Sequence, residues 1–335
     1  MSTLYFYEQG TRLSLKQNCL NVFSSGSENA VEVPFEQVEA VVLFGKIEAT
    51  SAVFTHCLER GIPVSWLSHR GKYYGRLQST EHVNIEKKRL QFACENDADF
   101  RNQIAAQILS AKVHNQRIVL EKIARRRNDL ELDRSIKLLE HYSNSINTER
   151  DISRMMGLEG TAAKLYFTEL GKSVPESFSF KGRNRRPPRD PFNSLLSFAY
   201  TLLIMEMVTQ IENAGLDPYA GLIHVGRQSN PALACDLIEE WRGIAADVLV
   251  LSLINHRQIK ADDFDTLEND GVYANRKTAE IFVRAFQEKM NRPIKSFSEA
   301  DDAMNFREAA SKQIGFLFQA MRENNPSLYS PVRYR

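Results

Sequence analysis

The sequence predicts an α+β protein, with a small β-rich amino-terminal domain over residues 1–84 and a larger all-α carboxy-terminal domain over residues 85–335. Two observations carry this prediction. Short aromatic, β-branched or alternating runs, separated by turn-forming residues, fill the amino-terminal part. From Ile85 onward, apolar residues recur at helical spacing instead, and strand signals nearly vanish. A chain of 335 residues is long enough to give each domain its own core.

The amino-terminal domain is expected to consist of strands with one embedded helix. The expected strands cover residues 4–7, 12–15, 20–23, 31–33, 38–44, 63–67 and 72–77. The helix begins after Thr50 or Ser51, either of which suits an N-cap, and stops at Gly61, with Pro63 just beyond.

The carboxy-terminal domain is expected to be helical throughout. The expected helices cover residues 104–123, 130–142, 152–167, 195–205, 231–253, 278–289 and 302–322. Residues 195–205 are apolar nearly all round, which is typical of a central, buried helix. Pro231 suits the first position of its helix.

The composition is that of an ordinary soluble protein, with 43% hydrophobic and 25% charged residues. A net charge of +1 neither favours nor excludes a polyanionic partner. No apolar run approaches membrane-spanning length and no signal sequence is evident, so we expect a cytoplasmic protein without a membrane partner. The four cysteines lie far apart, which indicates buried thiols rather than a zinc site or disulfides.

Glu159 stands out because it falls on the apolar face of a predicted helix. Burying a carboxylate there costs roughly several kcal/mol unless a cation or strong donors meet it. An ion pair with a neighbouring helix and a functional role are both open at this point. Gly157 and Gly160 weaken the helix, and we expect them to let another group approach the backbone closely.

His224 lies between two loop segments, residues 215–219 and 226–230. Such a placement suits a functional side chain held by a rigid frame. The chain has seven histidines, so a hydrogen-bonded structural histidine remains the alternative.

Three carboxylates follow on one predicted helix. Asp236 lies three residues before Glu239 and four before Glu240, so all three share a helix face. Two such acids beside a histidine can bind Mg²⁺ or Mn²⁺, although acidic clusters on helices are more often solvated faces.

A basic loop covers residues 181–189 and is held extended by prolines. Its cations are Lys181, Arg183, Arg185, Arg186 and Arg189. Guanidinium groups at this density suit phosphate contacts, and in a nearly neutral protein they favour nucleic acid over a solvated face.

Four ordered motifs then carry a resemblance. They are Leu-Glu-Gly-x-Ala-Ala-x-x-Tyr-Phe at 158–167, Arg-Arg-Pro-Pro-x-Asp-Pro-x-Asn-x-Leu-Leu-Ser-x-x-Tyr at 185–200, Gly-Leu-Ile-His at 221–224 and Ala-Cys-Asp-Leu-Ile-Glu-Glu-Trp-Arg at 234–242. Together they resemble the CRISPR-associated Cas-one family, the nuclease-integrases of spacer acquisition. The resemblance covers nearly the whole chain.

The resemblance implies that Glu159, His224 and Glu239 are catalytic and bind one divalent metal ion, Mg²⁺ or Mn²⁺. The family commonly has aspartate at the last position. Glutamate there keeps the charge and reaches one methylene further, which leaves open whether Asp236 shares or replaces this role. Arg227 matches a basic position near the phosphate and joins the loop cations as an expected DNA contact.

Three further residues match motif positions of the family. Tyr166 is expected to support the site, and Asn193 and Tyr200 are expected to have structural roles.

The resemblance further implies a metal-dependent DNA endonuclease and integrase of CRISPR adaptation. In the family reaction, a DNA 3′-hydroxyl attacks a phosphodiester at the repeat boundary and joins new spacer DNA to the array. The implied partners are double-stranded DNA (spacer precursor and CRISPR repeat), a second copy that makes a homodimer through the amino-terminal domain, and the small Cas-two protein. The alternatives are a non-catalytic DNA-binding scaffold and a metal-dependent nuclease that repairs branched DNA.

Overall fold

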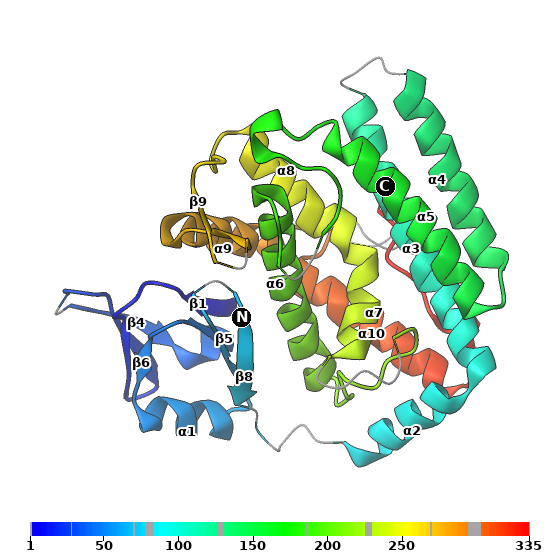
Figure 1. Ribbon diagram of the computed structural model, residues 1–335. Coiled ribbons are helices and arrows are strands. Elements are labelled where there is room, and N and C mark those ends of the chain that lie inside the picture. The colour runs from blue at the N-terminus through cyan, green and yellow to red at the C-terminus, as the bar shows by residue number, and fades with distance from the viewer. Residues whose placement is uncertain are drawn as a thin grey trace. The chain divides into compact units, whose positions relative to one another are not determined.

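The computed structural model describes residues 2–27, 29–69, 71–77, 79, 84–125, 130–184, 187–224, 230–268, 270–293 and 303–334. Its contacts define two compact units, one of Met1–Val83 with Ala274–Gln287 and one of Asn84–Tyr273 with Glu288–Arg335. Strands dominate the first unit and helices the second (Figure 1), which confirms the predicted α+β fold class. The contacts group residues 274–287 with the strands, whereas the sequence had placed them in the helical domain.

The first unit contains two four-stranded sheets. One has the order β1 (Ser2–Phe6), β5 (Val38–Phe44), β7 (Val64–Leu67) and β8 (Tyr73–Leu77), and the other β4 (Ala30–Pro34), β3 (Cys19–Phe23), β2 (Arg12–Lys16) and β6 (Glu48–Ala49). The central β5 pairs in parallel with β1 and β7, and β8 closes its sheet in antiparallel orientation. All seven predicted strands are present, while β6 and the short 3₁₀ turn η1 (Phe35–Gln37) were not anticipated.

The embedded helix α1 (Ser51–Glu59) packs on this unit as predicted. Val53 and Cys57 from α1 join Leu13, Val41 and other strand residues in one core. The helix ends before Gly61, which adopts a φ of +66° that favours glycine.

The second unit is a helical assembly. It contains α2 (Ile85–Asn96), α3 (Ala98–Ala124), α4 (Leu130–Thr148), α5 (Ile152–Gly171), η2 (Glu176–Phe178), α6 (Pro191–Asn213), α7 (Ala232–Trp241), η3 (Arg242–Asp247), α8 (Val248–Asn255), α10 (Phe306–Arg322) and η4 (Pro326–Leu328). Helices α3, α4 and α5 lie side by side, and α3 also contacts α7 (Figure 1). The short hairpin of β9 (Phe264–Thr266) and β10 (Val272–Ala274) was missed, and most of α9 (Arg276–Asn291) belongs to the first unit.

Helix α6 is the central helix of the second unit. By length and hydropathy it could cross a membrane, so the expectation that no run approaches that length was wrong. However, 72% of its most apolar window is buried inside the protein, and residues such as Leu195, Ala199 and Leu203 are fully covered. This burial confirms the prediction that residues 195–205 belong to a core helix.

The segment after Pro231 is not one regular helix. Helix α7 starts at Ala232, with Pro231 as its N-cap, and gives way to the π-helical η3 before α8. A π-helical turn inserts an extra residue and re-aims the side chains that follow, and such turns are frequent at functional sites.

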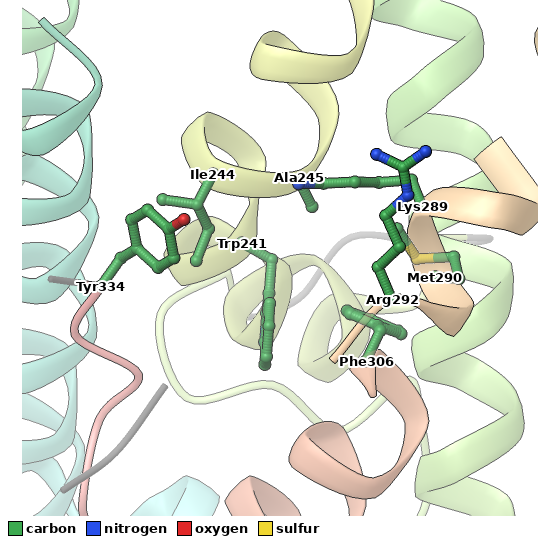
Figure 2. A pocket seen from close by; sticks show the side chains of 8 residues that line it. All are labelled: Trp241, Ile244, Ala245, Lys289, Met290, Arg292, Phe306 and Tyr334. Atoms are coloured by element: carbon green, nitrogen blue, oxygen red, sulfur yellow. The ribbon is translucent and has the colours of Figure 1, made fainter. Parts of the chain in front are cut away.

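A small pocket opens beside η3 (Figure 2). It is lined by Trp241, Ile244, Ala245, Lys289, Met290, Arg292, Phe306 and Tyr334. The lining is mostly apolar, and burial lowers the pKa of Lys289. None of the predicted site residues lines this pocket, so it is not part of the candidate site.

Gly157 and Gly160 face open space in the described part of the chain. A Cβ atom built on either would meet nothing within 4 Å among the described residues, so no described residue makes the expected close approach. Both glycines lie exposed inside α5.

We therefore expect Gly160→Ala to raise the free energy of unfolding by roughly 0.5–1 kcal/mol, because alanine costs less backbone entropy in a helix. Gly171→Ala is the matched control, since a Cβ there would lie 2.9 Å from the ring of Phe180 and should destabilise the same helix. Urea unfolding followed by circular dichroism measures both, and an equal change for the two variants would contradict this prediction.

Candidate active site

Glu159 lies on the buried side of α5, as its place in the sequence predicts. Met155 and Ala162, about one turn to either side, are fully buried. The Glu159 side chain is 13% exposed, and its Oε1 lies 2.5 Å from Nζ of Lys112 on α3. The charge on the apolar stripe is therefore met by an ion pair with a neighbouring helix, which was one of the two open alternatives.

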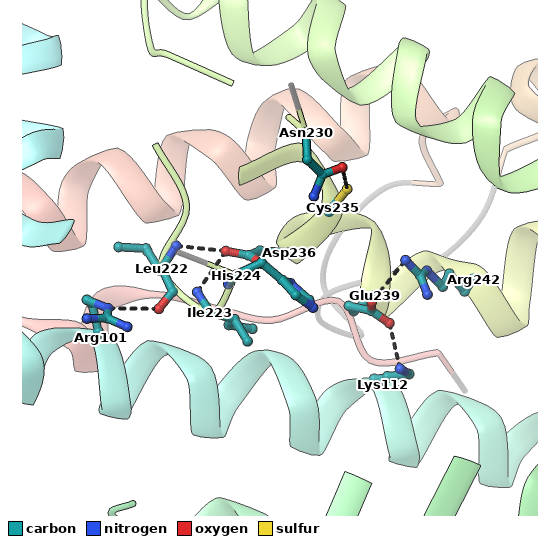
Figure 3. A network of polar contacts seen from close by, with 10 residues as sticks. All are labelled: Arg101, Lys112, Leu222, Ile223, His224, Asn230, Cys235, Asp236, Glu239 and Arg242. Atoms are coloured by element: carbon teal, nitrogen blue, oxygen red, sulfur yellow. Dashed lines mark hydrogen bonds and ion pairs between the residues drawn. The ribbon is translucent and has the colours of Figure 1, made fainter. Parts of the chain in front are cut away.

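Glu239 on α7 reaches the same lysine (Figure 3). Its Oε2 lies 2.6 Å from Lys112 Nζ, and its Oε1 lies 3.0 Å from Nη2 of Arg242, one turn further along. Burial raises the pKa of Glu239, but the cations Arg242 and Lys112 outweigh burial and hold the pKa at about 2. Two carboxylates from different helices thus share one ammonium group.

Asp236 fixes the loop that carries His224 (Figure 3). It is wholly buried, and its Oδ2 accepts the backbone N–H groups of Leu222 at 2.7 Å and Ile223 at 2.8 Å. Its Oδ1 accepts the backbone N–H of His224 at 3.2 Å and lies 2.6 Å from Nδ1 of the ring. The imidazole is therefore oriented by this carboxylate.

These contacts separate the roles of Asp236 and Glu239. Both oxygens of Asp236 are already used by the loop, whereas Oε2 of Glu239 faces the Lys112 ammonium that Glu159 also contacts. A carboxylate that holds one ring nitrogen of a histidine commonly orients the other nitrogen toward a metal. The geometry favours Glu239 as a ligand and Asp236 as the group that positions His224.

The donor set is chemically suited to a hard divalent cation. Two carboxylates and an imidazole are accepted ligands of Mg²⁺ and Mn²⁺. Within the described residues, no three His, Cys, Asp or Glu side chains already stand close enough to hold a metal. Lys112 instead lies between Glu159 and Glu239.

Glu240 belongs to a different network. It accepts hydrogen bonds from the Tyr329 hydroxyl at 2.6 Å, from the backbone N–H of Val332 at 2.6 Å and from Nε2 of Gln313 at 3.0 Å. Burial raises its pKa to about 8 against these three hydrogen bonds. Glu240 therefore anchors the carboxy-terminal segment and lies outside the candidate ligand set.

Tyr166 binds a buried acid, Asp247. Its hydroxyl donates to Asp247 at 2.9 Å, and that of Tyr200 donates at 2.6 Å. Burial raises the pKa of Asp247 to about 6, against these two hydrogen bonds. The guanidinium of Arg242, which holds Glu239, lies 4.9 Å from the Tyr200 ring centre. This chain of contacts links both tyrosines to a candidate ligand.

The basic loop is tied into the protein more closely than the sequence predicts. Arg183 donates to Oδ1 of Asn193 at 2.6 Å and to Oγ of Ser197 at 3.2 Å, so its guanidinium holds the loop against α6. Lys181 is exposed, and Arg189 is exposed with an ion pair to Asp270 at 3.0 Å. Of the described loop cations, Lys181 and Arg189 remain the better candidates for DNA contacts.

Three of the expected DNA contacts lie outside the described residues. They are Arg185, Arg186 and Arg227.

Sequence reasoning missed two cations at the site, Lys112 and Arg242, and the buried acid Asp247. A signal for Lys112 was present, because it lies on the apolar face of its helix, just as Glu159 does. Arg242 lies three residues after Glu239, at a spacing that permits an ion pair. Asp247 gave no such signal, since its place depends on the π-helical turn.

Three comparisons with known proteins bear on this site. The family model described as "CRISPR associated protein Cas1" matches residues 4–288. The "CRISPR-associated endonuclease Cas1 3" of Thermus thermophilus is 37% identical over 298 residues, which cover 88% of this chain and 86% of that protein.

Solved structures agree on the fold. A chain of a "Cas6-RT-Cas1--Cas2 complex" superposes with a TM-score of 0.83 at 27% identity, covering 99% of this chain and 36% of that longer chain. A Cas1 protein from Thermotoga maritima superposes with a TM-score of 0.80 at 23% identity, covering 96% and 97% of the two chains. With its ordered motifs and the converging side chains of α3, α5 and α7, this chain belongs to the Cas1 family of CRISPR-associated proteins.

Proposed function

We propose that this protein is a metal-dependent DNA endonuclease and integrase of CRISPR adaptation. It joins new spacer DNA to the repeat array through attack of a 3′-hydroxyl on a phosphodiester. The observation that carries the proposal is the convergence of Glu159 and Glu239 on a single cation, with Asp236 orienting His224 nearby. The name of the Thermus thermophilus relative, an endonuclease, supports the same class of reaction.

We assign Glu159, Glu239 and His224 as the residues that would hold Mg²⁺ or Mn²⁺. The bound ion would act as a Lewis acid toward the phosphodiester and stabilise charge in the transition state. Asp236 binds Nδ1 of His224 and leaves Nε2 as the ring atom for a ligand. Arg242 holds Oε1 of Glu239 and so fixes the direction of Oε2.

The substrate that fits this site is double-stranded DNA, both as spacer precursor and as CRISPR repeat. Lys181 and Arg189 supply exposed positive charge, and Arg183 keeps their loop in place. We further propose a homodimer formed through the amino-terminal unit and a small Cas2 partner. The structural relative that forms part of a Cas1–Cas2 complex supports that partner. The reaction is expected in the cytoplasm.

A joining assay tests the function. The full chain and its Cas2 partner are mixed with a short duplex that has free 3′-hydroxyls and with a plasmid that carries a CRISPR repeat. In Mn²⁺ or Mg²⁺ we expect the duplex to be joined at the repeat, and EDTA to abolish joining. DNA binding without any metal-dependent product would instead indicate a scaffold. Cleavage of branched DNA with no preference for the repeat would indicate a repair nuclease.

A further inference from the structure

Lys112 is the least expected member of the site. It lies on α3 among apolar neighbours, its side chain is only 10% exposed, and its ammonium contacts Glu159 at 2.5 Å and Glu239 at 2.6 Å. A lysine is rarely this buried unless it is paired. The two carboxylates that it pairs are the two proposed metal ligands, so the lysine and the ion need the same oxygens.

A divalent ion and the ammonium cannot both lie between these carboxylates. Each is attracted by the same two negative charges, and the two cations repel each other at such short range. Metal binding at the proposed site therefore requires Lys112 to release at least one carboxylate. Lysine suits such a movement, because its ammonium is a compact charge on a flexible four-carbon chain.

The backbone around Lys112 is held in place. Asn115, one turn along α3, donates from Nδ2 to the carbonyl oxygens of Glu240 at 2.7 Å and Val332 at 2.8 Å. On the other side, Ser110 lies 3.1 Å from the Ser143 hydroxyl of α4. The exchange of cations is thus confined to the Lys112 side chain, while α3 stays in position.

A displaced ammonium needs a new partner. Leaving it unpaired in a largely buried position is unfavourable, and the phosphate of bound DNA is the anion that the proposed function brings to this site. We propose that Lys112 is the resident counter-cation of the free protein, which the metal displaces and which then binds a DNA phosphate. Metal and DNA consequently bind cooperatively. This inference rests on the proposed function.

Binding of Mn²⁺ to the full chain, measured by electron paramagnetic resonance with and without short duplex DNA, tests the proposal. For the unaltered protein we expect the duplex to tighten Mn²⁺ binding about tenfold, within the usual range of coupling between sites. Lys112→Met should bind Mn²⁺ about tenfold or more tightly without DNA, and the duplex should then change its affinity less than about twofold. Lys112→Gln, which is also neutral but polar, should behave likewise and serves if the methionine variant fails to fold.

Lys172→Met is the matched control. Lys172 pairs with Glu169 on α5 and with Glu131 and is 43% exposed, whereas Lys112 pairs with two candidate ligands and is 10% exposed. Its loss should leave both Mn²⁺ affinity and the effect of DNA unchanged.

Unaltered or weaker Mn²⁺ binding by the neutral Lys112 variants would overturn the proposal, as would the absence of any DNA effect in the unaltered protein. Glu159→Gln and Glu239→Gln separate this failure from failure of the function. Both should lose Mn²⁺ binding at the site. If they bind Mn²⁺ as the unaltered protein does, the proposed metal site itself is wrong.

Discussion

Replacing Glu239 by glutamine is expected to lower metal-dependent DNA cleavage and joining by about a thousandfold or more. Loss of one group that stabilises transition-state charge typically costs a factor of about 10²–10³, and here a metal ligand is lost as well. The replacement keeps the shape of the side chain but removes the charge that Lys112 and Arg242 now balance. Glu159→Gln should have a similar effect, because both carboxylates are proposed to hold the same ion.

Glu169→Gln is the control for these variants. Glu169 is also a buried acid on α5, but it binds Ser135 at 3.0 Å and Lys172 at 3.0 Å, away from the candidate ligands. The Glu169→Gln variant should keep cleavage and joining activities within about twofold of those of the unaltered protein, since Glu169 is not a proposed metal ligand. Gel-based cleavage and joining assays at saturating Mn²⁺ provide the measurement. Nearly full activity of Glu239→Gln would exclude that residue from the site.

Arg307→Ala should destabilise the helical unit by about 3–5 kcal/mol, the usual cost of removing one partner of a buried ion pair. Arg307 on α10 donates from Nε and Nη2 to the two carboxylate oxygens of Glu206 on α6, both at 2.8 Å. Its side chain is 7% exposed and that of Glu206 only 2%. The substitution removes the guanidinium that binds both oxygens of the buried Glu206 carboxylate in α6.

The matched surface pair is Arg322 with Glu323, which lie 3.0 Å apart and are 61% and 46% exposed. Arg322→Ala should change the free energy of unfolding by less than about 1 kcal/mol, because exposed ion pairs contribute little. Urea denaturation of both variants gives the comparison. If the two variants lose similar free energies of unfolding, burial of the Arg307–Glu206 pair contributes little to stability.

The fold was largely predictable because its signals are local. The strands of the first unit follow alternating or β-branched runs, and α3 and α5 follow apolar stripes. The π-helical η3 and the assignment of residues 274–287 to the strand-rich unit were not predictable in this way. Both depend on tertiary contacts, which a single sequence does not display.

The site was predictable only in part. The apolar stripe marked Glu159 as a charge in need of a partner, but its partner Lys112 lies 47 positions away on another helix. Periodicity marks a residue as misplaced without naming what it contacts. The basic loop shows another limit, because its composition does not reveal that the Arg183 guanidinium is hydrogen-bonded to Asn193 and Ser197.

The contacts of the carboxy-terminal segment determine at what stage of folding the candidate site can form. Val332 and Tyr334 donate backbone hydrogen bonds to Glu240 and Asn115, across separations of 92 and 219 positions. Contacts of such long range slow folding, since much of the chain must be ordered before they form. They also require residues that are synthesised after those of α3 and α7. We therefore expect α3 and α7, which carry Lys112 and Glu239, to reach their final register only after translation of this segment.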